Sequence, residues 1–217
     1  MHLSMASTPA DRHLDIGCGA EPHNPYRKAE LHGVDIRQID PQASFRFSAA
    51  NLTLEPIPFP DSHFSSVSAF DFIEHVPRTM ASADGTGTRF PFVELMNEVW
   101  RVLAPGGRFY ALTPAFPSPQ AFRDPTHVNF ITEETHHYFV GDVPGARMYG
   151  FNGRFRTLRA GWVVSRDSQF AQPMSFRQKV RLFQHTVKGQ LSHYLWDLEA
   201  LKPAGTAGTT EAGASEF

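Results

Sequence analysis

The stretch His13-Leu14-Asp15-Ile16-Gly17-Cys18-Gly19-Ala20 decides the fold. Apolar Leu14 and Ile16 suit a strand buried in a sheet, and the two glycines that follow let the backbone turn sharply. A turn of this kind brings bare main chain against a ligand at the carboxyl end of a central parallel strand. The stretch therefore predicts an α/β fold with a ligand site at its first loop.

The spacing of the glycines argues against a dinucleotide as that ligand. A dinucleotide-binding loop has the form G-x-G-x-x-G, and its third glycine opens a helix that points at a pyrophosphate. Here Pro22 stands at the third position, and Asp15 stands two residues before the first glycine. A carboxylate at that place would repel a pyrophosphate and would attract a cationic ligand.

The stretch resembles motif I of the class I S-adenosylmethionine-dependent methyltransferases, whose usual form is D-x-G-x-G. Further blocks of that family follow in the family's order, over roughly residues 13–135. They are Gly33-Val34-Asp35-Ile36-Arg37, Pro58-Phe59-Pro60-Asp61-Ser62-His63-Phe64, Glu74-His75-Val76 and Arg101-Val102-Leu103-Ala104-Pro105-Gly106-Gly107. The resemblance implies a single-domain, Rossmann-like fold with a seven-stranded, mostly parallel sheet and helices on both faces.

The resemblance also implies S-adenosylmethionine as the cofactor. Asp15, Gly17 and Gly19 would hold its methionine part. Asp35 would hold the ribose, and Asn51 with Leu52 would lie on the adenine side. The whole expected cofactor-binding set is Asp15, Gly17, Cys18, Gly19, Asp35, Ile36, Asn51, Leu52, Phe70 and Asp71, with Asp71 at the boundary with the substrate.

Acids and histidines gather after the fourth and fifth predicted strands. The block Asp71-x-x-Glu74-His75 leaves the fourth strand at the edge where ligands bind. If it begins a helix, its two carboxylates and its imidazole share one face. Asp124 and His127 follow the fifth strand, in a polar loop punctuated by proline. Methyl transfer to oxygen needs the hydroxyl deprotonated, which a base or a metal can supply.

Two interpretations of these residues stay open. The blocks are similar to the E-x-x-E-H and D-H-x-F-x-x-T segments of the small-RNA 3′-end methyltransferases. This similarity implies that Asp71, Glu74, His75 and His127 hold a divalent cation such as magnesium, manganese or zinc. The alternative is a metal-free site in which His127 or His75 acts as the base and Asp124 caps a turn or orients His127.

The resemblance implies an S-adenosylmethionine-dependent methyltransferase, with a hydroxyl of a small metabolite, sugar or glycan as the expected acceptor. One alternative is 2′-O-methylation of an RNA end, which would need a basic, aromatic groove. The chain shows only scattered arginines at 154, 156 and 159. Another alternative is a cofactor-binding subunit without activity of its own, which serves a partner.

The bulk composition is that of one ordinary globular domain. The chain has 217 residues, a net charge of −2 and one cysteine. The charge argues against binding nucleic acid or anionic membranes by bulk electrostatics, and one cysteine allows no intrachain disulfide. Residues 1–12 lack the apolar run of a signal peptide, and no stretch approaches the length of a membrane span. We therefore expect a soluble protein of the reducing cytoplasm.

Residue patterns also predict the other elements. Strands are expected at residues 45–48, 64–70 and 108–113, a helix of about two turns at 26–31, and an amphipathic helix at 92–103. Residues 79–90 predict a mobile loop, because they are rich in Gly, Thr and Ser. Residues 154–165 predict either an antiparallel pair of strands or one bulged strand.

Residues 175–201 carry apolar side chains at helical spacing, with basic side chains among them. They predict an amphipathic helix that packs against the domain or against a second copy in a homodimer. A helix that lies on a lipid surface is the alternative. The methyltransferase domain would then cover residues 1–202 including this helix, and residues 203–217 would form a disordered tail with little to bury.

Overall fold

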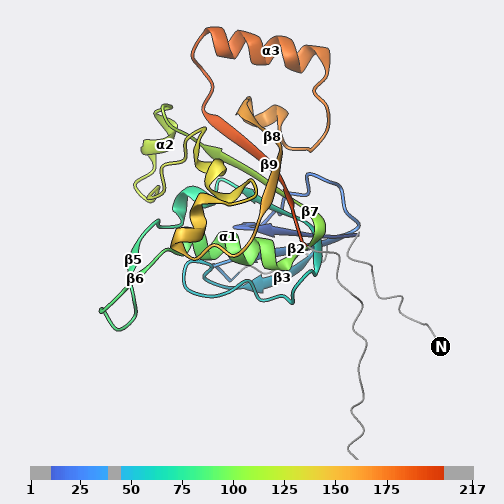
Figure 1. The fold of residues 1–217 in the computed structure, drawn as a ribbon. Coiled ribbons are helices and arrows are strands. Elements are labelled where there is room, and N and C mark those ends of the chain that lie inside the picture. The colour runs from blue at the N-terminus through green and yellow to red at the C-terminus, as the bar shows by residue number, and fades with distance from the viewer. Residues whose placement is uncertain (1–10, 39–44, 203–217) are drawn as a thin grey trace, which may run out of the picture.

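The computed structural model describes residues 11–38 and 45–202. In these ranges seven strands form one sheet in the order β3-β2-β1-β4-β7-β9-β8 (Figure 1). The strands are β1 (Arg12–Ile16), β2 (Glu30–Asp35), β3 (Arg46–Ala49), β4 (Phe64–Phe70), β7 (Leu103–Pro114), β8 (Phe155–Val163) and β9 (His193–Ala200). Only β9 runs antiparallel to its neighbours. The expected mostly parallel sheet is confirmed.

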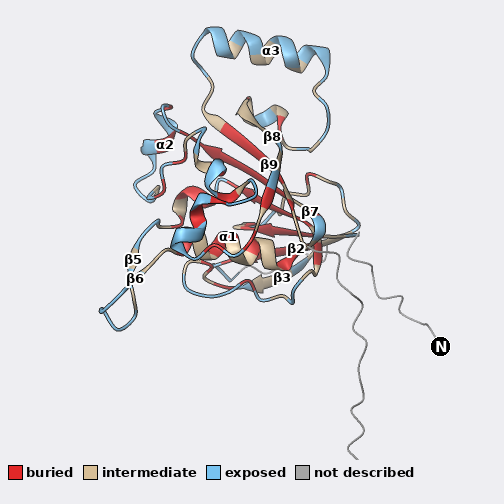
Figure 2. Cartoon of the chain, in the orientation of Figure 1, coloured by how far each residue is buried: buried red, intermediate tan, exposed pale blue. Residues whose placement is uncertain are grey.

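The strand order reverses direction between β1 and β4, and an open α/β sheet binds its ligand at such a point. Both strands are almost wholly buried, as central parallel strands are when both faces are covered (Figure 2). The buried ring of His13 on β1 is accommodated because its two nitrogens lie 2.7 and 2.9 Å from the hydroxyls of Ser66 and Ser68 on β4. The residues that follow β1 and β4 are therefore attached to rigid, buried strands.

One face of the sheet is covered by α1 (Pro91–Val102), close to the helix expected at 92–103. Pro91 suits the first helical position, and the apolar residues recur at helical spacing so that one side faces the sheet. The buried residues of α1 are Pro91, Phe92, Leu95, Met96, Val99 and Val102. The 3₁₀ turns at Thr135–Phe139 and Gly145–Tyr149 pack beside it with Phe139 and Ala146.

The helix expected at 26–31 is wrong, because residues 22–29 form turns and β2 already begins at Glu30. Asn24 closes the turn with its side chain, which accepts from Lys28 N at 2.9 Å and donates to Lys28 O at 2.8 Å. The Tyr26 hydroxyl then donates to Asp197 on β9 at 2.7 Å. This short, proline-rich connection therefore covers the second face of the sheet as a loop and not as a helix.

The helix expected over 175–201 is also wrong in its second half. Only α3 (Phe176–Val187) is helical, and residues 193–200 form β9 between β7 and β8. Tyr194, Leu195 and Leu198 are buried in the sheet. Their spacing fits a helix as well as a central strand, and a short apolar run does not separate the two by periodicity.

The remaining elements refine the expectations. Within residues 79–90, expected as a mobile loop, β5 (Met80–Ala81) and β6 (Thr88–Arg89) form a short hairpin. Residues 155–163 form one strand with a bulge between Thr157 and Arg159, the second of the two alternatives. The expectations for residues 1–10 and for the tail at 203–217 lie outside the described residues.

Candidate functional site

The loop after β1 folds over the carboxyl end of β2. Gly17 and Cys18 donate their backbone N–H groups to the carbonyl of Val34 at 2.8 and 3.1 Å, and Gly19 N–H donates to Asp35 Oδ2 at 3.0 Å. Gly17 and Gly19 have φ of +70° and +55°, which glycine adopts without steric cost. The first loop and the acid at the end of β2 thus form one continuous site.

Asp15 lies beneath this loop and is only 1% exposed. Its Oδ1 accepts from the hydroxyl of Ser68 at 2.5 Å, and its Oδ2 accepts from the backbone N–H of His23 at 2.7 Å. Burial raises the pKa of Asp15. The His23 ring stacks on Phe70 at 3.9 Å between centroids. Asp15 was expected to face a cationic ligand, but in this structure it holds the segment after the loop in place.

Asp35 lies at the end of β2, as expected for a residue that holds a ribose. Its Oδ1 accepts from Arg37 Nε at 3.0 Å, and its Oδ2 accepts from Arg37 Nη2 at 3.2 Å. Burial alone would raise the pKa of Asp35, but the hydrogen bonds from Arg37 and Gly19 outweigh it and the pKa is lowered. Asp35 is thus ionised, and Arg37, whose side chain is mostly exposed, occupies the oxygens that ribose hydroxyls would use.

The other residues expected to bind the cofactor lie in three different environments. Ile36 is exposed beside Asp35, where an adenine ring could pack on it. Leu52 is buried, and the side-chain oxygen of Asn51 accepts from Thr53 N at 3.2 Å, which closes a turn. The Cys18 thiol packs against Gly33, and burial raises its pKa to about 12. Cys18 therefore acts as a small buried side chain and not as a nucleophile.

Glu74 enters the interior from the 3₁₀ turn Ile73–His75 that follows β4. Its Oε2 accepts from the hydroxyl of Thr113 at 2.8 Å, whereas its buried Oε1 has no hydrogen-bond partner among the described residues. Burial raises the pKa of Glu74 to about 8. A buried carboxylate oxygen without a partner is costly unless something else pairs with it.

Two histidines stand beside this oxygen. His127 Nε2 lies 4.0 Å from Glu74 Oε1, and the rings of His75 and His127 meet edge to face at 4.8 Å between centroids. One ligand atom from each of the three residues lies within 4.8 Å of the others. The loop that carries His127 is fixed by Val128 and Asn129, whose N–H groups donate to Glu74 O at 3.0 and 2.9 Å.

Hydrogen bonds assign the tautomers of both rings. His127 Nδ1 lies 3.2 Å from the carbonyl of Ala121, which can only accept, so Nδ1 carries the proton. His75 Nδ1 lies 3.0 Å from the Thr126 hydroxyl, which donates to Asp124 Oδ1 at 2.6 Å and so accepts from the ring. Each ring therefore keeps its Nε2 lone pair free for a proton or a cation.

Asp71 and Asp124 do not join this group in the described structure. Asp71, expected as a fourth ligand, has φ of +46° and pairs with His193 Nε2 at 3.1 Å. Residues 73–75 form a single 3₁₀ turn, so the common helix face expected for Asp71, Glu74 and His75 does not exist. Asp124 accepts from the hydroxyl and the N–H of Thr126, and these bonds lower its pKa. Asp124 thus caps the following turn, as one of the two alternatives expected, and through Thr126 it orients His75 and not His127.

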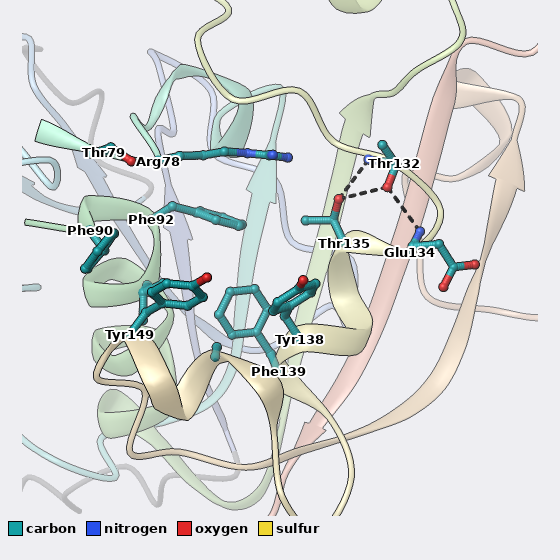
Figure 3. Close-up of a pocket in the computed structure, with 12 residues that line it drawn as sticks. Arg78, Thr79, Phe90, Phe92, Thr132, Glu134, Thr135, Tyr138, Phe139 and Tyr149 are labelled. Carbon is teal, nitrogen blue, oxygen red and sulfur yellow. Dashed lines mark hydrogen bonds between the residues drawn. The ribbon is translucent and has the colours of Figure 1, made fainter.

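A cavity of about 490 Å³ opens beside the segments that carry the two histidines (Figure 3). Figure 3 shows the Arg78 side chain extended above the ring of Phe92, with Tyr138 and Tyr149 on the other side of that ring. Arg78 Nε donates to Asn129 Oδ1 at 2.7 Å, and Nη2 donates to the Phe130 carbonyl. The other lining residues are Thr79, Phe90, Val93, Thr132, Glu134, Thr135, Phe139 and Ala146. Five of the twelve lining residues are aromatic, and polar side chains lie among them, as is common for ligand sites; we call it the aromatic cavity.

Sequence reasoning missed the residues that position these groups. No local sequence pattern predicts the contacts made by three of these residues, which are Thr113, Thr126 and Arg37. His193 lay inside the segment expected to be helical, so its approach to Asp71 followed from the strand β9 and not from sequence spacing.

Comparisons with known proteins agree with this geometry. Residues 14–111 match the family model described as "Methyltransferase domain". No curated protein sequence gives a significant match. Three solved structures of similar fold are the methyltransferase complexed with the Trm112 activator of Haloferax volcanii, an S-adenosylmethionine-dependent methyltransferase from Archaeoglobus fulgidus, and the geranyl diphosphate C-methyltransferase of Streptomyces coelicolor A3(2).

These likenesses extend over nearly the whole chain at low identity. The Haloferax structure has a TM-score of 0.55 at 14% identity and covers 93% of this chain and 87% of its own. The Archaeoglobus structure has a TM-score of 0.53 at 16% identity, and the match covers 88% of this chain and 86% of that structure's chain. The Streptomyces structure has a TM-score of 0.51 at 12% identity, and the match covers 91% of this chain and 73% of that structure's chain.

The chain thus has the fold of the class I methyltransferases, and residues 14–111 match the methyltransferase-domain family model. Solved S-adenosylmethionine-dependent methyltransferases share this fold. None of the helices in the described ranges is both long and apolar enough to cross a bilayer.

Proposed function

We propose that this protein transfers the methyl group of S-adenosylmethionine to a hydroxyl oxygen of a small metabolite, with a sugar or glycan as the favoured acceptor. The observation that carries the proposal is the group formed by Glu74, His75 and His127 at the carboxyl edge of the sheet. Carbon acceptors are also used on this fold, since one structural neighbour is a C-methyltransferase. A hydroxyl is favoured here because two imidazoles with free Nε2 atoms are available to remove its proton.

S-adenosylmethionine, when bound, would supply a methyl group on a sulfonium, which the acceptor oxygen would take as S-adenosylhomocysteine is released. His127 Nε2 would accept the hydroxyl proton. His127 is suited to accept the proton because the Ala121 carbonyl holds its other nitrogen protonated. Glu74 Oε1, 4.0 Å away, would stabilise the imidazolium that results once the Glu74 carboxyl, whose pKa burial raises to about 8, is itself ionised.

The same three residues fit a divalent cation. Glu74 has a buried oxygen without a partner, and each imidazole has its Nδ1 held by an oxygen, as metal-ligating histidines usually do. Glu74, His75 and His127 would hold the cation, which would lower the pKa of a hydroxyl bound to it. If no cation is bound, His127 alone would remove the hydroxyl proton as the general base.

The aromatic cavity is the proposed acceptor site. Glu74, His75 and His127 do not line it, but two segments connect them to it, since Arg78 lies three residues after His75 and binds Asn129, two residues after His127. Aromatic rings offer apolar faces to a sugar ring, and the hydroxyls of Tyr138 and Tyr149 with the Arg78 side chain offer polar contacts.

An RNA end is disfavoured as the acceptor. Arg154 pairs with Asp142, and Arg156 pairs with Glu199. Residue 156 lies near the start of β8, at the end of the sheet away from the loops that carry Glu74 and His127, because β8 runs parallel to β7. These arginines therefore do not line a groove that leads to the site.

The experiment measures S-adenosylhomocysteine release from the purified protein with S-adenosylmethionine and a panel of sugars, oligosaccharides, phenols and amines. Release with hydroxyl acceptors, lost in His127→Ala with product binding retained, supports the proposal. Release with amines alone contradicts it. A protein that binds S-adenosylhomocysteine but turns over none of the panel, and for which Asp15→Ala leaves a partner complex intact, would be the non-catalytic subunit instead.

A further inference from the structure

The helix α3 (Phe176–Val187) stands away from the body of the protein, on the connection between β8 and β9 (Figure 1). Figure 2 shows it almost entirely in the colour of exposed residues, and none of its residues is buried. None of its residues enters the core, so the expected packing of an apolar helix face against the domain is wrong. A helix of this length in isolation is marginal in water.

The apolar side of α3 faces away from the protein. Phe176 is 80% exposed, Phe183 69% and Val187 71%. At about 100° per residue these three and Val180 lie within about 60° of one another on the helix surface. The partly buried residues Gln178, Arg181, Leu182 and His185 lie on the opposite side. An ordinary surface helix has the reverse arrangement, with its apolar side toward the core.

The charge of this segment is uniformly positive. Residues 168–196 contain no Asp or Glu, although the whole chain has a net charge of −2. Arg181 pairs with Asp167 at 2.5 Å, whereas Arg177, Lys179 and Lys188 form no ion pair among the described residues. Phe176, Val180, Phe183 and Val187 form the apolar stripe of the helix. By helical position, Arg177 and Lys188 flank this stripe on one side and Lys179 flanks it on the other. Basic side chains so placed can reach lipid phosphates while the stripe enters the apolar layer.

The helix is held in this orientation by its inner side, where Gln178 Nε2 donates to Asp167 O and Arg181 pairs with Asp167, and by the segment before its N-terminus. Ser175 and Gln178 form a capping box, with N–H to oxygen distances of 3.4 and 2.8 Å. The preceding segment is fixed to the body, because the Tyr110 hydroxyl donates to Ser168 O at 2.9 Å and Ala171 N donates to Pro25 O at 3.0 Å. The outward apolar stripe is thus a feature of an anchored element.

The position of α3 relates it to the site. Val163 at the end of β8 and Pro114 at the end of β7 both pair with His193, so the β8–β9 connection leaves the sheet at its carboxyl edge. The same edge carries the glycine loop, Glu74 and His127. Three further aromatic side chains are exposed on the loops near His127, with Phe122 packed 4.9 Å from Phe130 and 6.3 Å from Phe116 between centroids.

We propose that α3 docks on an anionic lipid surface and holds the carboxyl edge of the sheet close to it. The occupant follows from charge complementarity: an exposed apolar stripe flanked by unpaired basic side chains matches acidic headgroups above an apolar layer. A core-packing role does not account for the stripe, because it presents Phe176 and Phe183 to solvent. The proposal concerns the partner of the enzyme and does not depend on which acceptor is methylated.

The test is flotation of the full-length protein with two kinds of vesicle, phosphatidylcholine alone and phosphatidylcholine mixed with phosphatidylglycerol. We expect binding to the mixed vesicles that weakens as salt is raised. Phe183→Ser should reduce the partition coefficient about tenfold or more, since a phenyl ring leaves the apolar layer. Lys179→Gln should reduce it about fivefold.

The matched control is Val143→Ser, because Val143 is 77% exposed outside α3 and outside the aromatic cavity. It should bind the mixed vesicles as the wild type does. Binding of S-adenosylhomocysteine by each variant verifies that the fold is intact. Equal recovery of the wild type with both vesicles overturns the proposal, as does unchanged binding by Phe183→Ser. A dimer in solution that Phe183→Ser dissociates, with no vesicle binding, would show that a second copy covers the stripe. Absence of hydroxyl methylation would leave all these results unaffected.

Discussion

His127 Nε2 lies 4.0 Å from Glu74 Oε1, although the two residues follow different strands, β4 and β7. The backbone sets this approach, because the Glu74 carbonyl accepts two N–H groups from the loop that carries His127. Thr113 on β7 fixes the other carboxylate oxygen at 2.8 Å. A buried acid is thereby presented to two imidazoles with one oxygen left unpaired.

Glu74→Gln tests this arrangement with a side chain of the same shape. The amide can keep the hydrogen bond with Thr113 but cannot offer a charged oxygen, so we expect kcat to fall about tenfold to a hundredfold. Calorimetric titration with Mn²⁺ should show heat with the wild type and none with the variant. Affinity for S-adenosylhomocysteine should be unchanged, since Glu74 lies outside the expected cofactor set. Equal activity of the two proteins would contradict the role of Glu74.

Asp35 and Arg37 form a second testable pair. Asp35→Ala should weaken S-adenosylhomocysteine binding by about tenfold to a hundredfold, because hydrogen bonds to a charged group are lost. Arg37→Ala is the matched control, and it should bind the product as well as the wild type or better, because Arg37 occupies the carboxylate oxygens. Calorimetry measures both variants. Weaker binding in Arg37→Ala than in Asp35→Ala would show that the arginine, and not the acid, contacts the ligand.

His13 predicts a pH dependence of stability. Burial lowers its pKa from 6.5 to about 3, so between these values the unfolded chain binds a proton that the folded chain does not. The neutral ring therefore leaves stability intact above pH 6.5, and stability is lost as pH falls below it. The loss is up to about 2 kcal/mol between pH 7 and pH 5. Urea unfolding should give a flatter pH profile for His13→Asn, even if that variant is less stable at pH 7. Parallel profiles would contradict the assignment.

Gly17 is predicted to tolerate no side chain. Its φ is +70°, and an added Cβ would lie 2.4 Å from the Phe72 ring. Gly17→Ala should lower the free energy of unfolding by about 1–2 kcal/mol and weaken cofactor binding, as the loop must shift. Gly161→Ala is the control, because a Cβ there meets nothing within 4 Å. Thermal melts that show equal losses for both variants would rule out the close approach of Phe72.

The Thr126 hydroxyl is predicted to act by positioning His75. It accepts from His75 Nδ1 and donates to Asp124, so Thr126→Val removes both bonds with little change in volume. We expect a moderate loss in kcat, about tenfold, with unchanged binding of S-adenosylhomocysteine. Thr126→Ser should restore the activity. A loss that the serine variant does not rescue would indicate that packing of the methyl group matters instead.

The sequence alone determined the class of fold and the place of the cofactor loop. Gly17 and Gly19 follow a buried strand, and their positive φ values show why glycine stands at both positions. Asp35 ends the next strand, and α1 begins within one residue of its predicted start. These features are local, because turn geometry and apolar periodicity act within a few residues.

Only the tertiary structure decided which side chains meet. Glu74 and His127 become neighbours because parallel strands bring their carboxyl ends to one edge, and Asp71 leaves the group because its backbone turns toward β9. The segment after α3 became a strand because the gap beside β7 could bury Leu195 and Leu198 on both faces. Helical spacing on α3 was visible in the sequence, but the direction of its apolar stripe was not. That direction depends on how the β8–β9 connection is anchored to the rest of the chain.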